Sequence, residues 1–179
     1  MTELYQCFLE KRYPEDWDTD WREHTHESLG LFLVQYLCNG FNLADAARLV
    51  YDDHYFKSGR KSFRFIRKKT EDRSDTEIVI PIIVPLQKIL DEIAAEPIKG
   101  SLVFPQIYAG EQNPEGMKAR VSQENQNIRK RLGRLVKTMG WEVAPSGTWC
   151  RHSFATNLSH AGGVPKEYIQ EAMGHSVMS

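Results

Sequence analysis

The sequence predicts an α+β fold that is mainly helical and contains one small β-hairpin. Apolar residues recur with the helical period over most of the chain, as in residues 27–40, where an apolar run closes on Gly40. The period changes to two only over residues 62–83, where SFRFIRKKT and TEIVIPII flank the turn-forming EDRSD. The length of 179 residues suits one domain with a core, preceded by a short arm.

Two parts are expected along the chain. Residues 1–26 are predicted to form an acidic arm, in which TELYQCFLEKRY is a short helix ended by Pro14 and PEDWDTDW is a connector. Residues 27–179 are predicted to form one domain, which starts with a helix over ESLGLFLVQYLCNG. The next helix is expected over NLADAARLV, because its apolar residues share one face.

Four more helices are expected after the hairpin. PLQKILDEIAAE has Pro85 in its first turn, where proline is favoured. A short apolar segment, SLVF, and a loop over AGEQNPEGMKA come next. SQENQNIRKRLGRLVKTMG is predicted to be an amphipathic helix, and RHSFATNLSHAGG and PKEYIQEAMG are the last two helices. The inward side chains of the amphipathic helix are expected to be Ile128, Leu132, Leu135 and Val136.

The net charge of −1 conceals an uneven distribution. Residues 1–28 hold eight acidic and three basic residues, a local charge of −5. Residues 57–73 hold eight basic and two acidic residues, and residues 117–138 hold seven basic and one acidic, so each segment has a local charge of +6. Two such segments in a chain of nearly zero average charge are compatible equally with a polyanionic partner and with two solvated faces.

Several classes of protein are disfavoured. No apolar run reaches the roughly 18 residues of a membrane span, and the N-terminus lacks the pattern of a signal peptide. The cysteines Cys7, Cys38 and Cys150 form no CxxC pair, so a reducing cytoplasm is the expected compartment. Apart from His24 and His26, which stand two residues apart, the histidines show no metal-ligand spacing. No metal and no cofactor is expected.

The end of the sequence suggests a site for phosphate chemistry. Arg151 stands in the first turn of an expected helix, where an anion is favoured, and its guanidinium can hold two phosphate oxygens. His175 follows the last expected helix and could bind another phosphate oxygen. A lysine near the tip of the hairpin could protonate a leaving oxygen. Such a site needs no metal ion.

The segment RHSFATNLSHAGG…IQEAMGHS resembles the C-terminal motif of the tyrosine recombinases, the phage-type integrase family. Upstream, LFLVQYLCNGFNLADAARLVYDD resembles the helix pair that carries the family's first arginine and its acidic partner. FRFIRKKTEDRSDTEIVIPI resembles the hairpin that carries the catalytic lysine. The resemblance is densest over residues 143–176 and covers about residues 27–179. It implies a catalytic-domain fold with the hairpin at the rim of a basic cleft, and DNA recombination or integration by a mobile genetic element.

The resemblance assigns roles residue by residue. Arg151 matches the family's second arginine, His175 its late His or Trp, Lys69 the hairpin lysine, and Asp45 the acidic residue three positions after the first arginine. In the family a tyrosine attacks the scissile phosphate and stays bound to DNA. Arginines and histidine stabilise the developing charge, and the lysine protonates the 5′ oxygen. Further contacts to double-stranded DNA are expected from Lys68, Arg67, Arg64, Arg129 and Arg131.

Three positions depart from the family pattern. Asn42 stands where relatives have the first arginine, and Thr148 stands where they have His or Tyr. The nucleophilic tyrosine is expected after Gly-His-Ser, but the sequence ends at Ser179. The chain is therefore expected to be a C-terminally incomplete catalytic domain that is inactive in strand cleavage. The intact protein would be a DNA strand-transferase that works as a homo-oligomer on DNA.

Other interpretations stay open. A structural role, in helix capping or packing, is the alternative for Asp45, Thr148 and His152. Lys68 and Arg67, on the same strand, are alternatives to Lys69, since a register error of one residue would select its neighbour. Arg48, one turn beyond Asp45, is an alternative source of the first guanidinium. The alternative function is a non-catalytic DNA-binding protein, either a degenerate recombinase or a helix-turn-helix regulator, because FATNLSHAGGVPKEYIQEAMGH imitates that motif.

Overall fold

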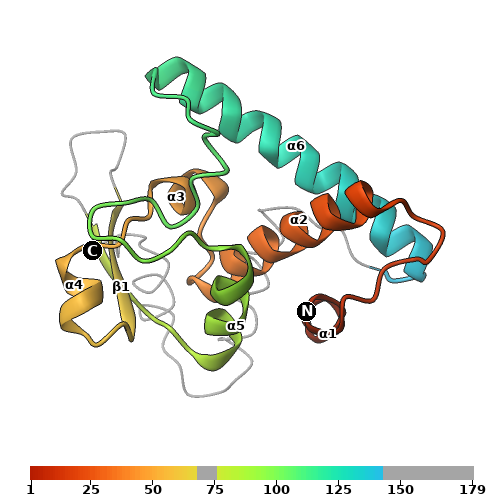
Figure 1. The fold of residues 1–179 in the computed structure, drawn as a ribbon, viewed down its shortest axis with the longest axis horizontal. Coiled ribbons are helices and arrows are strands. Elements are labelled where there is room, and N and C mark those ends of the chain that lie inside the picture. The colour runs from red at the N-terminus through yellow and green to blue at the C-terminus, as the bar shows by residue number, and fades with distance from the viewer. Residues whose placement is uncertain (68–75, 143–179) are drawn as a thin grey trace, which may run out of the picture.

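The computed structural model describes residues 1–67 and 76–142, and these ranges are mainly helical with one two-stranded antiparallel sheet. The α+β class is therefore confirmed. The helices are α1 (Thr2–Glu10), α2 (Thr19–Leu37), α3 (Leu43–Arg48), α4 (Asp53–Lys57), α5 (Val84–Ile93) and α6 (Pro114–Met139). The strands are β1 (Ser62–Arg67) and β2 (Thr76–Pro81). The last two expected helices lie outside the described residues. Figure 1 shows α6 beside α2, with α1 and the hairpin at opposite sides of the molecule.

Helix α2 is the centre of the hydrophobic core. All of residues 28–35 are buried, and the helix contacts α1, α3, α5 and α6 (Figure 1). A helix that is apolar on most of its sides has to be covered by several neighbours. It begins at Thr19, because the Asp18 side chain caps it by accepting a hydrogen bond from the Trp21 backbone N–H at 2.8 Å. The expected start at Glu27 is wrong, and part of the acidic connector belongs to α2.

Helix α1 packs against α2 and shares the same core. Its buried side chains are Leu4, Cys7 and Phe8. It ends at Glu10, because Lys11 takes the left-handed conformation with φ of 51°. The predicted short helix in this segment is confirmed, but the expectation that Pro14 ends it is wrong. The division of the chain into an arm and a domain at residue 27 stays a prediction.

The hairpin has the register that its period-two pattern requires. Phe63 pairs with Ile80 and Phe65 with Ile78, and all four side chains are buried. The alternate positions of the two strands are more exposed. One face of the hairpin therefore packs on the core while the other faces outward, as the sequence predicts.

Helix α4 adds to the elements predicted from the sequence. The Asp52 side chain caps it by accepting a hydrogen bond from the Tyr55 N–H at 3.0 Å. The ring of Tyr55 stacks on Phe63 at a centroid distance of 5.2 Å, which fixes α4 against β1. A helix of five residues is too short for a hydrophobic period to reveal it.

Helices α5 and α6 follow the predicted pattern, but α5 ends at Ile93 instead of the expected Glu96 and α6 starts earlier than expected. Pro85 lies in the first turn of α5, as expected. In α6 the four side chains predicted to point inward are all buried. The helix begins at Pro114 with Asn113 as its cap, so the expected loop over AGEQNPEGMKA is wrong from Pro114 onward. It ends at Gly140, whose φ of 70° suits glycine.

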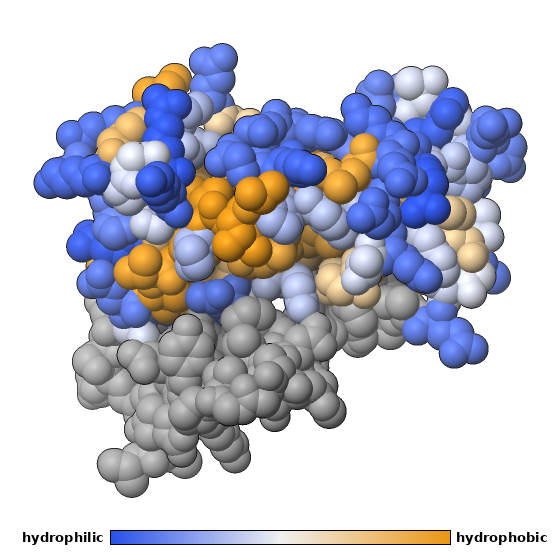
Figure 2. Space-filling view, turned by 90° about the horizontal axis from the view of Figure 1, so that it is seen from below, coloured by the Kyte–Doolittle hydropathy of each residue, from blue (hydrophilic) through white to orange (hydrophobic). Residues whose placement is uncertain are grey.

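The surface is largely hydrophilic on the face shown in Figure 2, with a central area of apolar side chains. Exposed apolar residues in the described ranges include Ile66 and Val79 on the outer face of the hairpin. Ile83 and Val84, at the start of α5, are also exposed. Over residues 1–67 and 76–142, no helix combines the length and the apolar character needed to cross a bilayer.

Candidate nucleic-acid interface

Asp45 lies where α3 meets β1, and its side chain is only 3% exposed. Its Oδ1 accepts a hydrogen bond from Arg48 Nη2 at 3.0 Å, and its Oδ2 accepts one from Arg67 Nη2 at 2.7 Å. A buried carboxylate needs such partners, because an unpaired buried charge is strongly destabilising. We call these three residues the Asp45 cluster.

The local sequence also builds Asp45 into a helix cap. Asn42 Oδ1 accepts a hydrogen bond from the Asp45 N–H at 2.8 Å, and Asp45 Oδ2 accepts one from the Asn42 N–H at 3.3 Å. These two bonds form a capping box at the start of α3. Asn42 therefore serves as an N-cap at the position where the resemblance expects the first arginine. The capping interpretation of Asp45 is correct, and it coexists with the ion pairs.

Aromatic rings support both guanidinium groups of the Asp45 cluster. Arg48 Cζ lies 5.2 Å from the centroid of Phe65, and Arg67 Cζ lies 5.9 Å from that of Phe41. The two rings are 4.7 Å apart, so they form one apolar support. The Arg67 side chain is 12% exposed and the Arg48 side chain is 38% exposed. Arg48 is therefore the member of the cluster that faces solvent.

The basic residues expected on the hairpin fall into three groups. Arg64 is exposed, with its Nε 3.8 Å from Asp52 Oδ2. Arg67, expected to contact DNA, directs Nη2 at Asp45 instead of outward. Lys68 and Lys69 lie outside the described residues. The choice of Lys69 as the proton donor stays a prediction.

The two basic residues singled out on α6 have different surroundings. Arg129 is exposed. Arg131 Nη1 donates a hydrogen bond to Ser28 Oγ on α2 at 3.1 Å and lies 3.6 Å from Glu124 Oε1. This geometry gives Arg131 a role in joining α6 to α2, whereas Arg129 is free to meet a ligand from solvent.

Two further basic residues on α6 contact tryptophan rings, which the sequence did not indicate. Arg134 Cζ lies 4.9 Å from the ring centroids of both Trp17 and Trp21, and Lys130 Nζ lies 6.0 Å from that of Trp21. These cation–π contacts bring a positive segment against the acidic start of the chain. No local pattern could have revealed them, because they depend on how α6 packs on α2.

The C-terminal motif lies outside the described residues, which includes Arg151, His175 and Thr148. The convergence of Arg151, His175 and the hairpin lysine stays a prediction. The structure does join two other parts of the resemblance, because Asp45 of the first motif contacts Arg67 of the hairpin.

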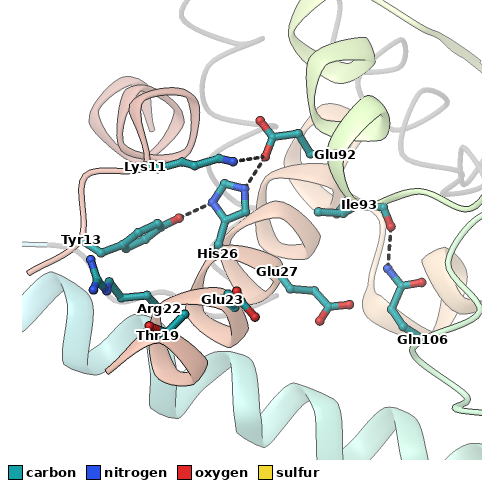
Figure 3. A pocket seen from close by; sticks show the side chains of 10 residues that line it. All are labelled: Lys11, Tyr13, Thr19, Arg22, Glu23, His26, Glu27, Glu92, Ile93 and Gln106. Atoms are coloured by element: carbon teal, nitrogen blue, oxygen red, sulfur yellow. Dashed lines mark hydrogen bonds and ion pairs between the residues drawn. The ribbon is translucent and has the colours of Figure 1, made fainter. Parts of the chain in front are cut away.

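A second polar cluster lies between α1, α2 and α5, and no pattern in the sequence indicated it (Figure 3). It lines a cavity of about 620 Å³. His26 Nδ1 lies 2.6 Å from the Tyr13 hydroxyl, and His26 Nε2 lies 2.5 Å from Glu92 Oε2. Lys11 Nζ is 3.8 Å from the same oxygen, and the ring of Phe8 stacks on His26 at 4.2 Å. We call Lys11, Tyr13, His26 and Glu92 the Glu92 cluster.

The described ranges contain no group of three or more histidine, cysteine or acidic side chains that could hold a metal ion. The two histidines considered as ligands make separate contacts. His26 belongs to the Glu92 cluster, and His24 Nδ1 lies 2.6 Å from the Asp20 carbonyl oxygen. They therefore do not form a shared site.

Comparisons with known proteins give a structural likeness but no match to a family or to a curated sequence. No protein-family model matches the chain, and no curated protein sequence matches it. Among solved structures, the chain is similar to the crystal structure of XerA recombinase, with a TM-score of 0.48 and 16% sequence identity. The match covers 98% of this chain and 67% of that chain. A likeness of this degree does not by itself define an activity.

Proposed function

We propose that this chain forms the catalytic domain, or part of it, of a site-specific DNA recombinase that cuts and rejoins strands through a phosphotyrosine intermediate. The observation that carries the proposal is the C-terminal motif RHSFATNLSHAGG…IQEAMGHS. The 2.7 Å contact between Asp45 and Arg67 supports it, because a recombinase site needs the first motif and the hairpin side by side.

The proposed chemistry divides among a few side chains. Arg151 and His175 stabilise the negative charge that develops on the non-bridging oxygens of the scissile phosphate. Lys69 protonates the departing 5′ oxygen. Asp45 orients the side chains of Arg48 on α3 and of Arg67 at the C-terminal end of β1, as its two ion pairs indicate. No metal or cofactor takes part in this scheme.

Double-stranded DNA is the proposed partner. The intact protein is proposed to bind it as a homo-oligomer. Arg64 and Arg129 are exposed and available for phosphate contacts, and Lys68 is proposed to act with them. Such contacts position the protein on DNA without reading its sequence. Binding should therefore weaken steeply with salt, because each phosphate contact releases counterions.

The joining half of the reaction tests the proposal, because it requires no tyrosine from the protein. A DNA strand that ends in a 3′ p-nitrophenyl phosphate imitates the phosphotyrosine intermediate. The 5′ hydroxyl of a second strand attacks the phosphorus and forms a new P–O bond. The bond to p-nitrophenolate breaks, and the hydroxyl proton passes to a base. Duplexes are first selected for binding from a random pool, and the release of p-nitrophenolate is then followed by absorbance.

We expect joining by the 179-residue chain in the presence of a metal chelator. Arg151→Ala should slow joining about 100-fold or more, because one donor to the developing oxyanion is lost. Arg12→Ala removes an exposed arginine just after the C-terminal end of α1 and should leave the rate unchanged. Salt-dependent binding without joining would favour the non-catalytic DNA-binding alternative. If the chain binds no duplex from the random pool, both the recombinase function and the non-catalytic DNA-binding function are refuted.

A further inference from the structure

The N-cap role of Asn42 leaves the Asp45 cluster without the arginine that the first motif of a recombinase would supply. Asn42 Oδ1 already accepts the hydrogen bond that starts α3. An amide also carries no charge, so it cannot replace a guanidinium in binding two phosphate oxygens. Another cation next to Asp45 has to meet the phosphate if this site processes DNA.

Arg48 has the geometry of a prepositioned anion ligand. Its Nη2 donates a hydrogen bond to Asp45 Oδ1 at 3.0 Å, its Nε donates one to the Ala44 carbonyl oxygen at 3.4 Å, and its Cζ lies over the Phe65 ring. In the described part of the chain, its Nη1 makes no hydrogen bond. A guanidinium that is fixed along one edge and open along another loses little entropy when it binds a phosphate.

The charge balance of the cluster favours an anion at Arg48. Counted over residues 1–67 and 76–142 alone, the cluster contains two guanidinium groups and one carboxylate. Arg67 is largely buried and gives Asp45 its shorter bond, 2.7 Å against 3.0 Å, so it serves to neutralise the carboxylate. The remaining positive charge is carried by Arg48, whose side chain is 38% exposed.

The position of Arg48 also suits a contact beside the expected catalytic lysine. Its guanidinium packs on Phe65 of β1, and Arg67 of the same cluster is the last residue of that strand. Lys69 follows Arg67 by two positions in the sequence. Arg48 therefore lies near the C-terminal end of β1, from which the chain continues to this lysine.

We propose that Arg48 binds a DNA phosphate in place of the missing first arginine, and that Asp45 and Phe65 position its guanidinium. This proposal rests on the proposed DNA-binding function. It assigns to Arg67 a structural task, the neutralisation of Asp45, and to Arg48 the contact with the ligand.

The first experiment compares DNA binding by Arg48→Ala and Arg12→Ala using fluorescence anisotropy over a range of salt concentrations. The two variants are matched, because each removes one exposed arginine that pairs with a carboxylate three or fewer positions away. We expect Arg48→Ala to weaken binding about tenfold and to reduce the salt slope by about 0.9, the value for one lost phosphate contact. Arg12→Ala should change neither quantity. Arg48→Lys keeps the charge and should retain the salt slope with part of the affinity.

The second experiment distinguishes a direct contact between Arg48 and a DNA phosphate from a folding defect of the variant. Single phosphates of the selected duplex are replaced one at a time by neutral methylphosphonates. One position should weaken binding of the wild type but not weaken Arg48→Ala any further. Urea unfolding shows whether each variant folds, and Arg48→Gln, which keeps a donor to Asp45 without the charge, serves if Arg48→Ala does not fold.

The possible outcomes separate this inference from the proposed function. If the wild type binds DNA and Arg48→Ala or Arg48→Gln behaves like Arg12→Ala, this inference is wrong while the proposed function stands. The inference is equally wrong if every methylphosphonate weakens the variant as much as the wild type. If the wild type binds no DNA, both the proposed function and this inference are refuted.

Discussion

Asp45 and Glu92 are both carboxylates that bind two basic side chains, but their surroundings differ. Asp45 is 3% exposed and pairs with two arginines at 3.0 and 2.7 Å. Glu92 is 32% exposed and pairs with His26 at 2.5 Å and with Lys11 at 3.8 Å. Both connect separate parts of the chain, since Asp45 joins α3 to β1 and Glu92 joins α5 to α2.

This contrast in burial explains what each cluster can do. Water and salt screen the exposed pair, so an ion pair of that kind contributes little to stability. The buried carboxylate has lost its hydration, so removing its charge or its partners is costly. Arginine also offers a rigid planar fork, whereas lysine is a flexible point charge. The Asp45 cluster is therefore suited to fix a guanidinium in place, and the Glu92 cluster is suited to link helices loosely.

Asp45→Asn is expected to have the strongest effect on stability. The change keeps the size of the side chain and an acceptor oxygen, but it removes the buried negative charge that pairs with Arg48 and with the largely buried Arg67. We expect the free energy of unfolding to fall by about 3 kcal/mol, with little dependence on salt. Urea unfolding at low and high salt measures both quantities. A loss below about 1 kcal/mol would place Asp45 in the class of exposed pairs and contradict the comparison.

A weaker effect is expected from Glu92→Gln, the matched change in the other cluster. The free energy of unfolding should fall by about 0.5 kcal/mol, because this carboxylate keeps contact with water. The loss should shrink as salt is added. The same urea experiment measures it. A loss as large as that of Asp45→Asn would contradict the comparison. It would show that the hydrogen bonds of His26 stabilise the protein strongly even though Glu92 is exposed.

The weakest effect concerns two tyrosines, Tyr13 of the Glu92 cluster and Tyr108, whose pKa responds to Arg48 of the Asp45 cluster. Burial raises the pKa of Tyr108, and the charge of Arg48 lowers it in part. Burial, with smaller contributions from Cys7 and Glu92, raises the pKa of Tyr13. Arg48→Gln should therefore raise the pKa of Tyr108, because a cation that stabilises the phenolate is lost. Glu92→Gln should lower the pKa of Tyr13, because a like charge is lost.

NMR titration of ring-labelled tyrosine measures the two pKa values, with each variant serving as the control for the other tyrosine. Shifts in the same direction would contradict the opposite charge that we assign to the two surroundings. Burial raises the pKa of Tyr108 above its ordinary value of 10.0, so the folded state releases this proton at a higher pH than the unfolded state does. Its contribution to stability is complete below pH 10 and is lost as the pH rises through the folded pKa.

The elements with a local pattern could be predicted from the sequence alone. Alternation placed Phe63 and Phe65 on the same face of the hairpin, and the helical period placed the inward stripe of α6; the structure shows that both are buried. These features depend only on neighbours along the chain, so their period reveals them. The early starts of α2 and α6 were missed, although the capping residues Asp18 and Asn113 were there to indicate them.

Which charged residues meet is a property of the tertiary packing. The sequence singled out Asp45, Arg67 and Arg131, but it did not show that Arg67 neutralises Asp45 or that Arg131 turns to Ser28. Nor did it indicate the contact between His26 and Glu92, which lie 66 positions apart. The sequence gives the type and charge of each residue, whereas the partner of a charged side chain depends on which helices and strands pack together. Burial then determines whether an ion pair holds its side chains in one position or is weakened by water.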